Sequence, residues 1–211
     1  LDDKSRTCYK WNVIKTSDSS SDIVELLLDH DLPGDTEWIS LEDYQAAGGN
    51  AEEYGSYRNN KYGPLTALKH LKQATDSWNG VVTLTSGDNV TRNNGSDGNY
   101  TINYEGYEAR LISGQEIADI AGNQEWTPGG DLIQGLPTWF YSNIAVSVDE
   151  EGNPTFNDVY EHAVYWTDSA YAWEPATAWG LYYVGRLSNL PVSRAGGCGV
   201  RPVVKILKSN L

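Results

Sequence analysis

Residues 165–169 read Tyr-Trp-Thr-Asp-Ser, and residues 199–206 read Gly-Val-Arg-Pro-Val-Val-Lys-Ile. Both runs are rich in β-branched and aromatic residues, which predicts strands over 163–166 and 200–207. The stretch between them consists largely of Ala, Gly, Ser, Pro, Tyr and Trp and has no helical periodicity. We therefore expect an irregular, aromatic-rich excursion held at both ends by strands, which is how a rigid scaffold usually presents a binding surface.

The sequence has 211 residues, a length that one β-containing domain commonly reaches. We expect a single domain over 1–211, with a loop-rich insertion at 33–63 and a ligand-display region at 163–207. Fifteen basic and twenty-nine acidic residues give a net charge of −14. Such a surface repels nucleic acid and anionic membranes. No apolar run approaches the roughly twenty residues that a membrane span needs.

Composition also bears on where the protein acts. Eight Trp and fourteen Tyr stand against two Phe, and aromatic residues with a polar end are favoured at wet recognition surfaces as well as in cores. The sequence begins at Leu1 without Met, so we expect any export signal or anchor to lie upstream. The expected location is extracellular or on the cell surface.

The two cysteines, Cys8 and Cys198, lie near opposite ends of the sequence. Metal sites and redox pairs usually have close spacing such as C-x-x-C, which is absent. A disulfide between them would close a loop of roughly 190 residues and contribute about 4–5 kcal/mol by chain entropy. It requires the first and last strands to be neighbours. The alternative is two unpaired, buried thiols.

Local patterns predict the remaining elements. Ser113 and Glu116 form a capping box for a helix over 114–121, and Pro64 starts a helix over 64–78. Residues 33–63 lack clear periodicity and are either a surface excursion or weakly helical. His162 is expected to be packed or paired at a strand start. The other expected elements are an N-terminal hairpin of 8–14 and 23–29, a strand over 81–85, a loop over 86–99, a hairpin of 100–104 and 107–112, and strands over 144–148 and 155–159.

Three motifs in order carry a resemblance to a known family. They are Arg-Leu-Ile-Ser-Gly-Gln-Glu-Ile at 110–117, Tyr-Trp-Thr-Asp-Ser at 165–169 and Gly-Val-Arg-Pro-Val at 199–203. Their order and spacing resemble bacterial C-type-lectin-fold domains of the formylglycine-generating-enzyme subgroup, with Ile112-Ser113 in place of the usual Pro-Thr. The resemblance covers roughly residues 60–207.

This resemblance implies an α+β, C-type-lectin-like fold with two helices, small antiparallel sheets, long loops and paired N- and C-terminal strands. Those paired strands are what a Cys8–Cys198 bridge would need. The resemblance also implies that Arg110, Glu116 and Arg201, which are charges within apolar stretches, form a buried ion pair or network that fixes the scaffold.

We expect a non-enzymatic, adhesin- or receptor-like protein that binds an unknown protein or glycan. Tyr, Trp and Arg dominate interfaces because they bury a large area and keep a hydrogen-bonding end. Some of these aromatics are alternatively core residues, and strand alternation favours Tyr183 over Tyr182 for the core. The candidate contacts are Ser169, Tyr171, Ala172, Trp173, Trp179, Tyr182, Arg186, Asn189 and Arg194.

A narrower resemblance is to the variable proteins of diversity-generating retroelements, which use the same fold and randomise a C-terminal stretch. Their substitutions fall on adenines, often in AAC codons, which cannot yield Trp or Glu. Trp173, Glu174 and Trp179 would then be fixed framework. The positions compatible with diversification are Tyr171, Ala172, Tyr182 and Asn189.

Two other functions compete with this one. Trp-Glu-Pro-Ala at 173–176 is similar to the Glu-Pro-Asn sugar motif of calcium-dependent lectins, but Ala176 replaces the amide ligand, and Ca²⁺ needs six to eight oxygens. An oxidase like the formylglycine-generating enzymes would use active-site cysteines, yet Cys198 has only Cys8 as a companion. We therefore expect no catalytic residue, no metal and no cofactor.

Overall fold

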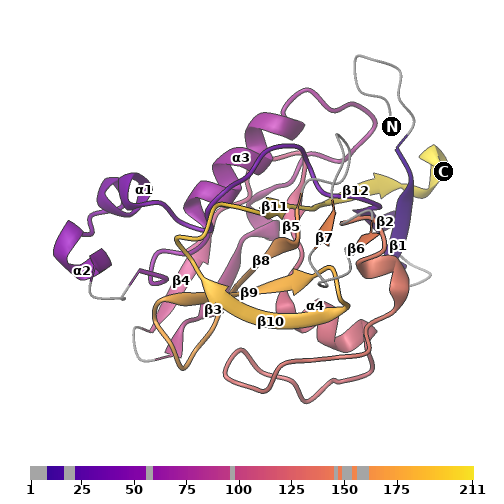
Figure 1. Ribbon diagram of the computed structural model, residues 1–211. Helices are drawn as coiled ribbons and strands as arrows, with labels where there is room; N and C mark the ends of the chain where they lie inside the picture. Colours follow the sequence, from indigo (N-terminus) through magenta and orange to yellow (C-terminus); the bar gives the residue numbers. More distant parts are fainter. Residues whose placement is uncertain are drawn as a thin grey trace.

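The computed structural model describes residues 9–16, 22–55, 59–95, 98–144, 147–148, 154–155 and 162–211. The protein has an α+β fold, which confirms the expected class (Figure 1). The resemblance implied two helices, and the described residues contain four. They are α1 (Leu41–Ala46), α2 (Ala51–Gly55), α3 (Leu65–Thr75) and α4 (Gly114–Ile120), with 3-10 turns η1 (Ser86–Asp88), η3 (Thr138–Phe140) and η4 (Lys208–Asn210).

One sheet joins the two ends of the sequence. Its order is β1-β2-β12-β5, formed by β1 (Trp11–Thr16), β2 (Ile23–Leu28), β12 (Pro202–Leu207) and β5 (Arg110–Leu111), all antiparallel. The expected N-terminal hairpin and the expected pairing of N- and C-terminal strands are both confirmed. The last strand in chain order therefore lies inside the sheet, between β2 and β5.

The second sheet replaces the irregular excursion that we expected. Its order is β10-β9-β8-β11, formed by β10 (Arg186–Pro191), β9 (Thr177–Tyr182), β8 (Val164–Ala170) and β11 (Cys198–Val200). The prediction of an irregular stretch was wrong, because β9 and β10 form a regular antiparallel hairpin. Every residue of β8 is buried, and strands covered on both faces lose the polar–apolar alternation by which strands are recognised.

Two small hairpins complete the strands, β3 (Val90–Asn93) with β4 (Asn99–Ile102) and β6 (Ser147–Val148) with β7 (Pro154–Thr155). The loop predicted over 86–99 was therefore wrong in part. The hairpin of 100–104 and 107–112 was also wrong, because β4 pairs with β3, and β5 pairs with β12. The strands predicted over 144–148 and 155–159 are confirmed at 147–148 and at Thr155, whereas Ile144 lies in a turn and Pro154 joins the pairing.

The strand predicted over 81–85 does not form. The Val82 N–H donates to the Lys205 carbonyl at 2.7 Å, and the Leu84 N–H donates to the Tyr107 carbonyl at 2.8 Å. The Leu84 carbonyl also accepts from the Gly106 N–H at 2.9 Å. The bonds of this segment thus go to two different partners and form no ladder, although Leu84 is buried. β-branched composition alone does not make a strand without a continuous partner.

The helices follow their local signals. α4 begins after the capping box, in which the Ser113 side chain accepts from the Glu116 N–H and the Glu116 side chain accepts from the Ser113 N–H. α3 begins directly after Pro64 and ends three residues before Trp78, so the predicted helix was slightly too long. Within 33–63 the weakly helical alternative is confirmed by α1 and α2.

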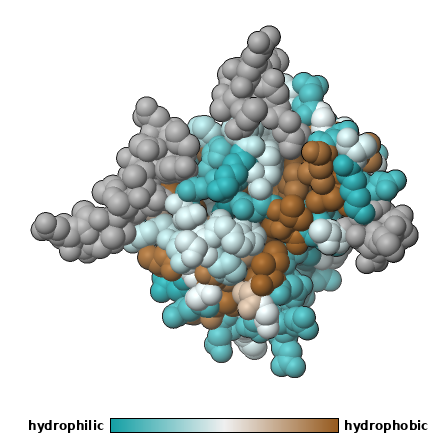
Figure 2. Space-filling view, turned by 90° about the vertical axis from the view of Figure 1, so that its right-hand side faces the viewer, coloured by the Kyte–Doolittle hydropathy of each residue, from teal (hydrophilic) through white to brown (hydrophobic). Residues whose placement is uncertain are grey.

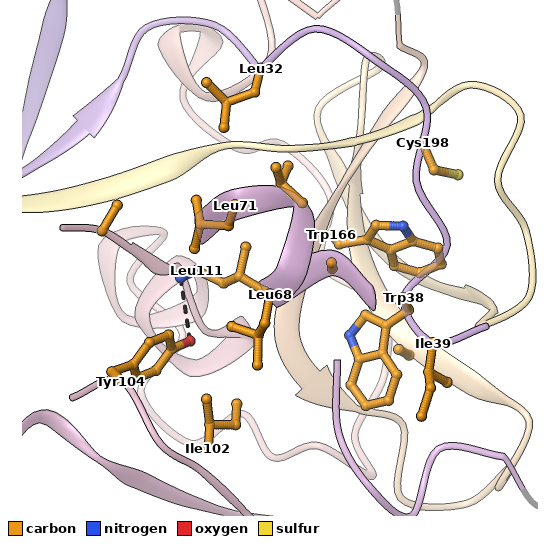
Figure 3. Packing of buried hydrophobic residues seen from close by; sticks show 14 of the residues in the cluster. Leu32, Trp38, Ile39, Leu68, Leu71, Ile102, Tyr104, Leu111, Trp166 and Cys198 are labelled. Atoms are coloured by element: carbon orange, nitrogen blue, oxygen red, sulfur yellow. Dashed lines mark hydrogen bonds between the residues drawn. The ribbon is translucent and has the colours of Figure 1, made fainter. Parts of the chain in front are cut away.

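The core consists of two apolar clusters on opposite faces of β8. Val164 and Trp166 pack with α3 in the larger cluster, whereas Tyr165 packs with α4 in the other. Figure 1 shows α3 and α4 on opposite sides of the β8–β9–β10 sheet. In the larger cluster, Leu68 and Leu71 of α3 lie around Leu111, whose N–H donates to the Tyr104 hydroxyl at 3.3 Å (Figure 3).

Two buried tryptophans tie the 36–38 segment to β8. The Trp38 indole N–H donates to the Thr167 carbonyl, and the Trp166 indole N–H donates to the Thr36 carbonyl, both at 2.9 Å. Figure 3 shows the two rings near each other in the core. Each ring is buried with its polar atom satisfied, as a buried indole requires.

The outer surface is mainly hydrophilic with local apolar areas. Seen from the side that carries β1 and the C-terminal η4, a hydrophobic band crosses a hydrophilic surface (Figure 2). Val13 of β1 and Leu207 at the end of β12 are exposed hydrophobic side chains. Among the described helices, none has the length and apolar character needed to cross a membrane.

Candidate recognition site at the β8–β9 loop

The predicted contacts fall into two groups on opposite faces of the β8–β9–β10 sheet. Asn189 lies directly opposite Trp179, and Arg186 lies directly opposite Tyr182. Residues three apart on one strand point to opposite faces, so Asn189 and Arg186 are not on one surface. Tyr171 packs edge-on against Trp179, with ring centroids 5.2 Å apart, and therefore belongs with Asn189.

The loop between β8 and β9, residues 171–176, is held by three other segments. The Asn60 side-chain amide donates to the carbonyls of Tyr171, Glu174 and Thr177, at 3.3, 3.4 and 3.0 Å. On another side the Ala172 N–H donates to the Pro128 carbonyl at 3.0 Å. The third contact is Gly95, where any side chain would collide with the Ala172 carbonyl.

Trp173 is the most exposed aromatic side chain at this site. Its relative exposure is 76%, yet its indole N–H donates to the Gly129 carbonyl. A Cβ atom at Gly129 would lie 2.5 Å from the indole nitrogen, so glycine permits this close approach. The ring is therefore both displayed to solvent and held in place.

Two predicted contacts are corrected because they are buried. Trp179 is 1% exposed, and its indole N–H donates to the Pro128 carbonyl at 2.9 Å. Ser169 is also buried; its hydroxyl accepts from the Gly114 N–H at 3.1 Å and lies 3.0 Å from Asp168. Neither side chain is therefore accessible to a ligand.

Tyr171, Ala172 and Asn189 are half-buried on the Trp173 side of the sheet. The Asn189 side chain lies 3.5 Å from the Thr177 hydroxyl. Tyr182 and Arg186 are half-buried on the other face, where Arg194 is exposed. Strand alternation predicted that Tyr183 rather than Tyr182 lies in the core. It did not distinguish the two, because both side chains are half-buried and both pack against a core cluster.

The structure joins two of the three predicted scaffold charges. Arg110 donates to both carboxylate oxygens of Glu116, at 2.9 and 2.5 Å, and also pairs with Glu25. Burial alone would raise the pKa of Glu116, but the Arg110 charge and its hydrogen bonds outweigh burial, so this pKa is lowered.

Arg201 lies apart from that pair and is fully buried. Its guanidinium donates to four backbone carbonyls, those of Leu28, Asp29, Trp139 and Phe140. It also lies 5.2 Å from the centre of the Tyr165 ring. A buried cation is thus stabilised by carbonyl dipoles and an aromatic face.

A polar cleft of about 330 Å³ lies beside the Arg110–Glu116 pair. Its further ion pairs are Arg92 with Asp168, joined by two bonds of 3.0 and 2.7 Å, and Lys205 with Asp88. No local pattern predicts this cleft, since Arg92 and Asp168 are 76 positions apart in the sequence. Because its cations are already paired with carboxylates, the cleft is a scaffold feature.

His162 is packed and paired at the start of β8, as expected. Nδ1 is bound to Asp31, and Nε2 lies 3.3 Å from Asp35. Burial raises the pKa of the Asp31 carboxyl, which His162 partly offsets. The described residues contain no group of three or more His, Cys, Asp or Glu side chains able to hold a metal ion.

Cys198 is buried at the start of β11, and burial raises the pKa of its thiol to about 12. None of the described residues forms a disulfide with it. Cys8, its expected partner, lies outside the described residues, so the bridge stays a prediction. Tyr9, which follows Cys8, packs against the cluster that contains Cys198.

Sequence reasoning missed the residues that hold the loop. Asn60 lies in a polar stretch without periodicity, and nothing in the sequence links it to residues 171–177. Pro128-Gly129-Gly130 carries a usable signal, because such a triplet marks a tight turn.

Comparison with protein-family models, curated proteins and solved structures gives no match.

Proposed function

We propose that this protein is a non-enzymatic, adhesin- or receptor-like binding protein whose recognition surface is centred on the β8–β9 loop. The observation that carries the proposal is Trp173, an indole that is 76% exposed while its N–H is bound to Gly129. Exposed tryptophans anchor interfaces when they insert into a partner. A ring that is already held loses little conformational freedom on binding, which favours affinity.

The surroundings of Trp173 suit a binding surface. The loop backbone is held by Asn60, Pro128 and Gly95, so little ordering is needed when a ligand arrives. Tyr171, Ala172 and Asn189 are half-buried on the same side and can add polar and apolar contacts around the anchor. The ligand class that we propose is a protein or a glycan.

The proposal also covers the type of fold and the place where the protein acts. We propose a C-type-lectin-like fold and action outside the cell, on the strength of the motif resemblance and the paired N- and C-terminal strands. Sequence diversification is a further part of it, since Tyr171, Ala172, Tyr182 and Asn189 are all partly accessible. Comparing the coding stretch for 163–204 among sibling copies tests it, and an invariant stretch would refute it.

The competing functions have less support. A nucleophilic thiol needs a lowered pKa, whereas burial raises the pKa of Cys198 to about 12. A calcium-dependent lectin needs six to eight oxygen ligands, and Ala176 offers no side-chain oxygen where the related sugar motif has an amide.

The test is to screen the protein on glycan and protein arrays and to repeat the screen with Trp173→Ala. We expect a hit to weaken ten-fold or more, as for a hot-spot side chain worth about 2 kcal/mol. The melting temperature should stay nearly unchanged because the ring is largely exposed.

Two variants serve as controls. Leu41→Ala removes an exposed apolar side chain on α1 and should leave binding intact. Trp179→Ala removes a buried ring and should lower the free energy of unfolding by about 3–5 kcal/mol. Unchanged binding by a folded Trp173→Ala variant would refute the proposed surface.

A further inference from the structure

Arg186 lies at the start of β10, on the face that points away from Trp173, and Arg194 follows the end of that strand. The Arg186 guanidinium sits 5.2 Å from the centre of the Tyr182 ring, which is directly opposite it on β9. Burial raises the pKa of the Tyr182 phenol, and the charges of Arg194 and Arg186 lower it. Both arginines therefore act on one tyrosine.

These two arginines differ from most of the other described Lys and Arg side chains. Eight described Lys and Arg side chains have a carboxylate within 4.0 Å, and Arg201 is bound by backbone carbonyls. For Arg186 and Arg194, no carboxylate of the described residues lies within that distance. In a chain with a net charge of −14, two guanidinium groups without a carboxylate partner stand out.

Arg186 also has an unmet hydrogen-bonding requirement. Its Nε is buried and finds no acceptor among the described residues. A buried donor without an acceptor is costly, whereas a carboxylate accepts from the planar guanidinium fork with two parallel bonds. The Tyr182 ring holds this fork in place.

Asp35 and Arg194 both act on Cys198: burial raises the pKa of this thiol, the Arg194 charge lowers it, and the Asp35 carboxylate raises it. Asp35 already accepts from the Gly197 N–H at 3.0 Å and lies 3.3 Å from His162. It therefore leaves the arginines available to an external anion.

We propose that Tyr182, Arg186 and Arg194 form a subsite that takes a carboxylate of an Asp or Glu side chain from a partner protein. The inference rests on the proposed binding function and adds to it a second contact site, on the face of the sheet opposite Trp173. Val184, which is 56% exposed in the turn before Arg186, supplies an apolar contact. An acidic side chain within a protein segment offers both an anion and apolar neighbours, whereas an acidic sugar surrounds its carboxylate with hydroxyl groups.

The test is an NMR titration of the full chain with hexaglutamate, following the arginine Nε–Hε resonances. We expect the Arg186 resonance to shift to saturation with hexaglutamate but not with hexaglutamine. Arg186→Gln and Arg194→Gln should each weaken binding about five-fold or more. Arg186→Lys keeps the charge but loses the planar fork, and it should weaken binding as well.

Controls separate the subsite from general charge and from the loop surface. Lys208→Gln removes the same charge from the C-terminal turn and should change binding less than about two-fold. Trp173→Ala should leave hexaglutamate binding unchanged, so the subsite can fail while the loop surface stands. The proposal is overturned if no Arg186 shift occurs, or if Lys208→Gln weakens binding as much as Arg186→Gln. It is also overturned if trigalacturonate binds and hexaglutamate does not, which would indicate an acidic glycan.

Discussion

At the scale of single residues, the buried charges are each bound by several partners. Arg110 pairs with both Glu116 and Glu25, and Asp168 accepts two bonds from Arg92. Replacing one member of such a group leaves the others buried and uncompensated. These positions therefore control stability, although none of them lies on the proposed recognition surface.

Glu116→Gln isolates the charge of one such residue, because Gln can still complete the capping box with Ser113. The folded-state pKa of Glu116 lies below its ordinary value of 4.5, so ionisation stabilises the folded state above pH 4.5. This contribution is lost as the pH falls through the lowered pKa. Chemical denaturation should show the variant less stable by up to about 3 kcal/mol at pH 7, with the difference shrinking below pH 4.5.

Glu42→Gln is the matched control, since Glu42 is exposed on α1. Its stability should follow that of the unmodified protein within about 0.5 kcal/mol at neutral pH. A Glu116→Gln difference that stays constant from pH 7 to pH 3 would contradict an ionic contribution.

The different exposure of two tryptophans could not be predicted from the sequence. Trp173 and Trp179 were equal candidates in the sequence, yet one is exposed and the other is buried. The difference arises from the 126–131 segment, whose Pro128 and Gly129 carbonyls bind the two indoles. Because that segment is about 45–50 positions away in the sequence, no local pattern separates the two residues.

At the scale of elements, Asn60 reinforces a β8–β9 loop that also has backbone hydrogen bonds of its own, from the Tyr171 N–H to the Thr177 carbonyl and from the Thr177 N–H to the Glu174 carbonyl. The buried Asn60 amide donates to three backbone carbonyls, those of Tyr171 and Glu174 in the loop and of Thr177 at the start of β9. A loop that is fixed from outside can change its side chains without losing its path. This property suits a recognition surface whose side chains differ among sibling copies of the protein.

Asn60→Ala should loosen this loop although Asn60 itself is buried and touches no ligand. We expect a stability loss of about 1–3 kcal/mol from the three lost amide hydrogen bonds and faster amide hydrogen exchange at Ala172 and Thr177. Ligand binding should weaken too, because the loop must be ordered again. Asn79→Ala, which removes an exposed amide bond to Ser77, should do neither. Unchanged exchange in Asn60→Ala would show that other contacts suffice.

Elements encoded by neighbouring residues were predictable, and those that depend on distant partners were not. The capping box of α4 lies within four residues, and the β1–β2 hairpin joins two consecutive segments. By contrast, β9 contains Ala, Gly and Trp that are all buried, so it has no alternating pattern. The 81–85 segment has strand composition but meets two different partners, which its sequence does not reveal.

At the scale of the whole molecule, the proposed Cys8–Cys198 bridge would join the two ends of the sequence. Thiol titration of the denatured, unreduced protein should find no free thiol. Reduction should then lower the free energy of unfolding by about 4–5 kcal/mol. Cys198→Ser, which leaves one thiol, calibrates the titration. Two thiols in the denatured, unreduced protein would instead support the alternative of two separate buried cysteines.

The place of β12 has a consequence for how this chain is made. β12 lies between β2 and β5, and Arg201 just before it satisfies the carbonyls of Leu28 and Phe140. A ribosome delivers residues in order, so β2 and β5 emerge long before the strand that separates them. Until residues 201–207 leave the exit tunnel, β2 keeps an open strand edge, which invites pairing with other nascent chains. This sheet can therefore close only after residues 201–207 have emerged, and shielding the edge of β2 until then protects the chain against such pairing.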